Sequence, residues 1–150
     1  METKAILKSV ELFNGLTGEQ LEMLAPDTAQ VEKKKGDALF NVGEEANDLY
    51  VLLDGKISIQ VKLSSRPETV GIVVLQKHGQ LVGWSGLIGG SHYTAKALCQ
   101  EDCKLLKVDG TAMMKVLESN PAAGFEVMRE ISKVISNRMH NLQSVVLKTI

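Results

Sequence analysis

Short apolar segments separated by glycine-containing turns fill residues 29–108, and helical periodicity is absent there. The clearest unit is at Asp54-Gly55, a dipeptide typical of two-residue hairpins, which joins residues 49–53 to residues 57–63. In the second of these segments apolar and polar residues alternate, which predicts one buried face and one solvated face. About eight such segments predict a mainly β fold, an antiparallel β-roll or jelly roll.

Helical patterns precede this region. Residues 3–13 carry apolar side chains at helical spacing and predict one short helix. Thr17 and Gln20 match a capping box at the start of a second helix. We therefore expect short N-terminal helices over residues 1–28, before a β-roll over residues 29–108.

Two further helices are expected over residues 109–150. Asp109 is a good cap for a helix that runs to about residue 117. Asn120-Pro121 places a capping residue and a first-turn proline at the start of a helix that continues to about residue 147. That second helix would be about 40 Å long at 1.5 Å per residue.

The long helix carries an apolar stripe that one small sheet cannot cover. We infer a second copy of the same helix as its partner, which makes the chain a homodimer. The alternative is a helix packed wholly on its own domain. The expected interface residues are Met128, Ile131, Ile135, Arg138, Leu142 and Val145.

Charge and composition exclude several classes of protein. The net charge of −1 argues against a dedicated nucleic-acid surface. No apolar run approaches the roughly 20 residues of a membrane span, and the N-terminus lacks the apolar stretch of a signal peptide. The 2 cysteines are too few for a disulfide framework. We expect a cytoplasmic protein that does not bind a membrane.

No constellation of catalytic or metal-ligating residues is visible in the sequence. A metal or iron–sulfur site needs about four suitable ligands. The chain offers 2 cysteines and 3 scattered histidines, and Ser85 with His92 is no more than a coincidence of residue types. We predict no enzyme activity, no metal and no cofactor.

The candidate ligand site is the glycine-rich stretch 79–97, which contains the only tryptophan, Trp84. Glycines permit close approach of the backbone to a ligand, and free N–H groups at such a bend suit an anion. The stretch reads as a short strand, a bend, a brief helical turn, a loop and a returning strand.

The glycine framework as a whole resembles the cyclic-nucleotide-binding domain family, the jelly-roll sensor half of catabolite-activator-like regulators. The resemblance covers roughly residues 10–147 and includes the short and the long C-terminal helices. It rests on Gly36-Asp37, Gly43-Glu44, the run 49–57, Gly79, Gly83 and Thr94-Ala95. It implies that the phosphate-binding cassette of the family falls on residues 79–97.

Two charged contacts of that cassette are replaced. The family has glutamate for the ribose hydroxyl where this chain has Trp84, and arginine for the cyclic phosphate where it has Tyr93. Each charge-assisted contact contributes about 1.5–3 kcal/mol, so losing both weakens binding by about 10²–10⁴-fold. We expect no binding of cyclic AMP or cyclic GMP at physiological concentration.

Several interpretations of the site stay open. Trp84 and Tyr93 either line a pocket for an apolar, aromatic or cationic ligand or fill the vacated space as core. Backbone amides of residues 86–88 offer a residual anion site. Arg138 reaches a ligand, pairs across the dimer or extends to water. The candidate pocket residues are Gly83, Trp84, Ser85, Gly86, Leu87, Ile88, Tyr93, Thr94, Ala95, Arg138 and Leu142.

The sequence therefore favours a non-catalytic sensor domain that reads a small molecule other than a cyclic nucleotide. A dimerisation module without a ligand and a weak cyclic-nucleotide binder are the alternatives. Regulators of the family carry a DNA-binding domain after the long helix, and this sequence ends at Ile150. We expect no direct DNA binding by this chain, and whether it is a fragment stays open.

Overall fold

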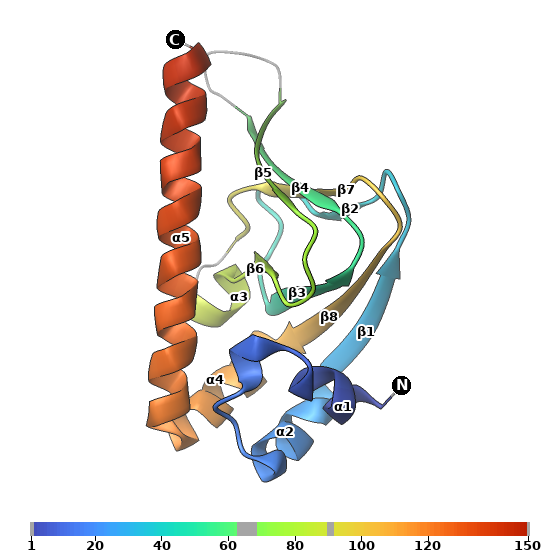
Figure 1. Ribbon diagram of the computed structural model, residues 1–150, viewed down its shortest axis with the longest axis vertical. Coiled ribbons are helices and arrows are strands. Elements are labelled where there is room, and N and C mark those ends of the chain that lie inside the picture. Colours follow the sequence, from blue (N-terminus) through green and yellow to red (C-terminus); the bar gives the residue numbers. More distant parts are fainter. Residues whose placement is uncertain (1, 63–68, 90–91, 150) are drawn as a thin grey trace.

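Two antiparallel sheets form the body of the protein (Figure 1). The structure is a computed structural model that describes residues 2–62, 69–89 and 92–149. The four-stranded sheets have the orders β1-β8-β3-β6 and β2-β7-β4-β5, so most neighbouring strands are distant in sequence. This arrangement confirms the predicted jelly roll. The strands are β1 (Thr28–Lys33), β2 (Ala38–Phe40), β3 (Asp48–Asp54), β4 (Ile57–Lys62), β5 (Thr69–Leu75), β6 (Leu81–Gly83), β7 (Lys96–Cys99) and β8 (Cys103–Asp109).

The predicted hairpin at Asp54-Gly55 is wrong in one respect. Its two strands do not pair, because β3 belongs to one sheet and β4 to the other. The dipeptide forms a tight corner instead, with Gly55 at a φ of 109°. A Cβ at Gly55 would lie 2.6 Å from the carbonyl oxygen of Asp102, in the neighbouring corner between β7 and β8. The turn thus connects the two sheets, and only glycine fits at this position.

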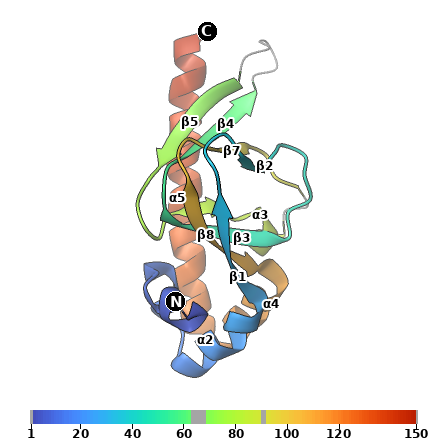
Figure 2. The same cartoon turned by 90° about the vertical axis from the view of Figure 1, so that its right-hand side faces the viewer.

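Helices flank the roll at one end and along one side. They are α1 (Thr3–Lys8), η1 (Glu11–Phe13), α2 (Gly18–Leu24), η2 (Ala25–Asp27), α3 (Ser85–Ile88), α4 (Gly110–Ser119) and α5 (Pro121–Thr149). Figure 2 shows α5 behind the roll and parallel to its long direction. Among the described residues, no helix has both the length and the apolarity that a membrane crossing requires.

The predicted helix caps are present. Thr17 and Gln20 form both hydrogen bonds of the capping box. The Asp109 carboxylate accepts from the Ala112 amide at 2.9 Å. A single helix over residues 3–13 is wrong, because the chain leaves α1 at Ser9 and resumes as η1. The Ser9 hydroxyl donates to the Ile6 carbonyl, which competes with helical continuation.

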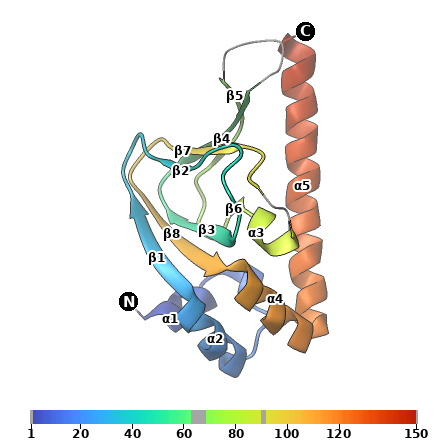
Figure 3. The same cartoon turned by 180° about the vertical axis from the view of Figure 1, so that it is seen from behind.

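The core has two parts. One lies between the sheets and contains Leu52, Ile57 and Leu105. The other lies between the helices and the first sheet and includes Phe13, Leu49 and the α5 residue Ile131. The N-terminal half of α5 is therefore anchored in its own domain, beside the bend that leads from β6 into α3 (Figure 3).

Candidate functional site

Close backbone contacts hold the bend between β6 and α3 in place. A Cβ at Gly86 would lie 2.3 Å from the Asp48 amide nitrogen. A Cβ at Gly110 would lie 1.9 Å from the Gly86 carbonyl oxygen. The first residues of α3 and α4 thus pack against each other and against the start of β3 without side chains between them. This framework fixes where Trp84 stands, immediately before α3.

Trp84 is covered by Arg138 of α5. The guanidinium carbon lies 4.4 Å from the centre of the indole ring, within cation–π range. Arg138 also donates from Nη2 to the Leu81 carbonyl of β6. It forms no ion pair in the described ranges. Burial lowers the pKa of Arg138 to about 10, so the side chain stays cationic at neutral pH. Arg138 therefore ties α5 to the roll instead of extending to water.

Tyr93, which the resemblance places at the family's arginine position, is built into the core. Its ring stacks on Phe40 with centroids 3.9 Å apart and an interplanar angle of 10°. Its hydroxyl donates to the Asp48 carbonyl at 3.0 Å. Burial raises the pKa of Tyr93 far above its ordinary value. The site thus presents a neutral ring where a cyclic phosphate would need a cation.

Little open space is left in this cassette. The remaining cavity has a volume of about 30 Å³, close to the ~30 Å³ share of one water molecule. Small-molecule pockets usually offer about 300–1,000 Å³. The lining residues of this cavity are Phe40, Ile59, Val82, Gly83, Trp84, Ser85, Tyr93, Thr94, Ala95 and Arg138.

The structure brings seven of the eleven candidate pocket residues to this cavity. Leu87 is buried in the core between helices and sheet, and Leu142 does not line this cavity. The amides of Leu87 and Ile88 donate to the Trp84 carbonyl, which removes them from an anion site. Phe40, Ile59 and Val82 were missed, and only their place in alternating strands could have indicated them.

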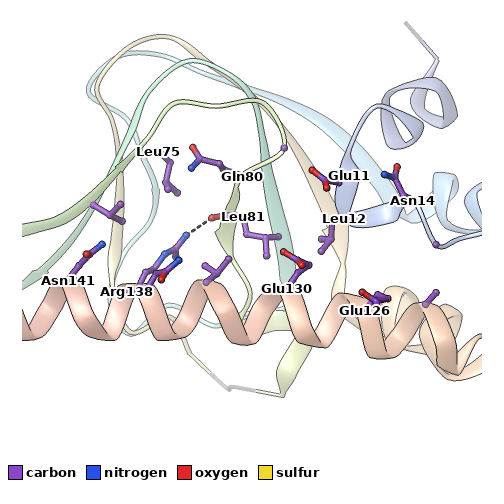
Figure 4. Close-up of a pocket in the computed structure, with 16 residues that line it drawn as sticks. Glu11, Leu12, Asn14, Leu75, Gln80, Leu81, Glu126, Glu130, Arg138 and Asn141 are labelled. Atoms are coloured by element: carbon purple, nitrogen blue, oxygen red, sulfur yellow. Dashed lines mark hydrogen bonds between the residues drawn. The ribbon is translucent and has the colours of Figure 1, made fainter.

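A larger cavity lies outside the cassette, between α5, η1 and the segment from β5 to β6 (Figure 4). Its volume is about 460 Å³. This cavity was not predicted, although Glu126, Glu130, Asn137 and Asn141 follow one flank of the predicted long helix. The lining residues are Glu11, Leu12, Asn14, Gly15, Val73, Leu75, Gly79, Gln80, Leu81, Ala123, Glu126, Glu130, Val134, Asn137, Arg138 and Asn141.

The expected interface residues occupy different faces of α5. Ile131 is 2% exposed and belongs to the core of its own domain. Met128, Ile135 and Leu142 are half-buried. Three apolar side chains of α5 outside the expected set are more exposed, namely Phe125 at 66%, Met139 at 59% and Leu147 at 76%. The side chains available to a partner thus lie away from Ile131 and Arg138.

The two cysteines are buried free thiols. Burial and the neighbouring Cys103 raise the pKa of Cys99 to about 12, so its thiolate is scarce at neutral pH. In the part of the chain that the structure describes, no three His, Cys, Asp or Glu residues are placed to hold a metal ion.

The fold and the cassette define a sensor module of the cyclic-nucleotide-binding type. The model of the cyclic nucleotide-binding domain family matches residues 30–120, and the chain belongs to that family. The sensor domain of the transcriptional regulator DNR from Pseudomonas aeruginosa aligns with a TM-score of 0.77 and 21% identity, over 93% of this chain and 95% of that one.

Two other relatives also match most of the chain. A putative cyclic nucleotide-binding protein from Geobacter metallireducens aligns with a TM-score of 0.74 and 25% identity, over 93% of this chain and all of that one (100%). Potassium channel AKT3 from Oryza sativa subsp. japonica is 23% identical over 137 residues, which is 89% of this chain. The alignment spans only 15% of the channel.

Proposed function

We propose that this chain is a non-catalytic sensor module that has lost the usual binding of cyclic AMP and cyclic GMP and signals through α5. The observation that supports this most is the cavity of about 30 Å³ at the cassette. A cyclic nucleotide entering there must break both the Arg138–Trp84 contact and the Phe40–Tyr93 stack. Such contacts contribute about 0.5–2 kcal/mol each. This cost adds to the loss of the two charged contacts.

The test is a fluorescence titration, because Trp84 is the only tryptophan of the chain. We expect no saturable change in its emission with micromolar cyclic AMP or cyclic GMP. Trp84→Phe serves as the control that assigns the signal. Saturation at micromolar nucleotide would contradict the proposal, and saturation only at millimolar nucleotide would favour a weak cyclic-nucleotide binder.

We also propose that α5 pairs with α5 of a second copy. Met128, Ser132, Ile135, Met139 and Leu142 follow a spacing of four and three residues, which is the seam of a left-handed coiled coil. None of these five side chains is fully buried in the single chain. A ligand that shifts α5 against the roll would then change the dimer by population shift.

Met139→Glu is expected to convert the dimer into monomers. The substitution places like charges opposite each other within the seam, and Met139 makes little contact with its own domain. Light scattering should report half the dimer mass. His140→Glu, exposed on another face of α5, is the matched control and should stay dimeric. An unchanged mass for Met139→Glu would rule out this interface.

The filled cassette also favours a second candidate, a dimerisation module without a ligand. A thermal-shift screen separates the two, because a sensor is stabilised by its ligand and a purely structural module by none. The two free thiols suit a reducing compartment, so we keep the cytoplasm as the proposed location.

A further inference from the structure

We propose that the cavity of about 460 Å³ between α5, η1 and the β5–β6 segment binds a small amphipathic organic cation. Its carboxylates would hold an ammonium group and its apolar wall the body of the ligand. The site is separate from the cassette. The proposal rests on the proposed function only because a sensor requires a ligand.

The size and the wall suit a small molecule. The volume lies within the range of about 300–1,000 Å³ that is usual for ligand pockets. Apolar side chains reach it from four elements, namely Leu12 of η1, Leu75 of β5, Leu81 of β6 and Val134 of α5. Leu75 and Leu81 are each 5% exposed, so the apolar wall is held in place by the core behind it.

Carboxylates gather at one end of the cavity. Figure 4 shows Glu11 of η1 facing Glu126 and Glu130 of α5 across the opening. Glu130 pairs with Lys133 at 3.1 Å, whereas Glu11 and Glu126 form no ion pair within the described residues. Two uncompensated carboxylates from separate elements favour a cation between them.

The other end has the opposite polarity. Arg138 and the Asn141 amide lie there, on the far side of Leu81 from Glu126 (Figure 4). An ammonium group is repelled from that end and attracted to the carboxylates, which gives the ligand one orientation. In the described part of the chain no acidic cluster can hold a metal ion, so an organic cation with its own N–H donors fits better.

Arg138 connects this site to signalling. It lines both the large cavity and the cassette cavity. It also joins α5 to β6 through the Leu81 carbonyl and to the cassette through Trp84. A ligand packed against Leu81 therefore acts on the same contact that positions α5 on the roll. Its binding should change the emission of Trp84.

The test compares matched probes by calorimetric titration of the full chain. Phenethylamine and hexylamine carry the charge, and phenethyl alcohol and 3-phenylpropionate are the neutral and anionic controls. We expect saturable binding of the amines and at least about tenfold weaker binding of the controls. Equal binding of amine and alcohol, or no binding of the amines, would overturn the proposal.

Variants locate the site. Glu11→Gln with Glu126→Gln removes the free carboxylates and should weaken amine binding by about tenfold or more. Glu32→Gln with Glu118→Gln makes the same change of charge at exposed positions outside the cavity. This control pair should leave the affinity for the amines unchanged. Undiminished amine binding by the first pair would refute the assignment.

A second variant tests the apolar wall independently of charge. Val134→Phe fills the cavity and should abolish amine binding, whereas His140→Phe on an exposed face of α5 should not. Retained affinity in a folded Val134→Phe variant would count against this cavity. A parallel titration with cyclic AMP keeps the two proposals apart, because tight nucleotide binding contradicts the proposed function whatever the amines do.

Discussion

Gly110→Ala is expected to lower the free energy of unfolding by about 3 kcal/mol, at the upper end of overpacking effects. The added Cβ would lie 1.9 Å from the Gly86 carbonyl oxygen and 3.0 Å from the Asn47 carbonyl oxygen. Both neighbours are backbone atoms, so no side chain can rotate away. Gly110 lacks a positive φ, which makes the effect steric and not conformational.

Chemical denaturation followed by circular dichroism measures this loss. Gly18→Ala is the matched control, because its Cβ would meet only the end of the Lys4 side chain at 3.8 Å. Alanine favours a helix by about 1 kcal/mol over glycine, so the control should be neutral or slightly stabilising. A Gly110→Ala protein as stable as the control would show that α3 and α4 are not packed as described.

Most of the helices and strands could be predicted from the sequence, because local patterns specify them. Capping residues such as Thr17 and Asp109 act through hydrogen bonds three residues away. The predicted alternation in residues 57–63 is only partly right, because Ile57 and Ile59 are buried but Ser58, expected on the solvated face, is also buried, at 4% exposure, in a strand flanked by β5 and β7. Residue 63 lies outside the described residues. The pairing of the strands could not be predicted from the sequence. Asp54-Gly55 specifies a tight turn with a positive φ, but pairing depends on partners such as β8, about fifty residues away.

The site was predictable in position and not in shape. The glycine framework and the resemblance placed Trp84 and Tyr93 together, and both line the same small cavity. The filling of that cavity depends on Phe40 and Arg138, which come from distant elements. The larger cavity depends on η1 lying beside α5, a contact between segments more than a hundred residues apart. No local pattern encodes such a contact.

The pair Trp84→Glu and Tyr93→Arg is expected to raise the affinity for cyclic AMP by about 10²-fold or more. The two changes restore the carboxylate and the guanidinium that the resemblance assigns to the ribose and the phosphate. They also remove both aromatic side chains from the closed cassette, which opens space for the nucleotide. The gain should fall toward the lower end of about 10²–10⁴-fold, because Arg138 would compete for the new carboxylate at position 84.

Titration calorimetry of the double variant and of each single variant measures this gain in affinity. It also measures the coupling free energy between the two substitutions. Trp84→Gln with Tyr93→Gln is the control, because it opens the same space without charge. The uncharged pair should gain only the part that comes from removing the ring contacts, and the charged pair should bind cyclic AMP more tightly than the uncharged pair does. An equal gain from the uncharged pair would mean that the aromatic rings exclude the nucleotide by volume alone. A folded charged pair with no gain would show that the framework around Gly86 and Gly110 no longer presents a cyclic-nucleotide site. Each single variant should gain less than half of the total on a logarithmic scale, since phosphate and ribose contacts reinforce each other once the nucleotide is held at both ends.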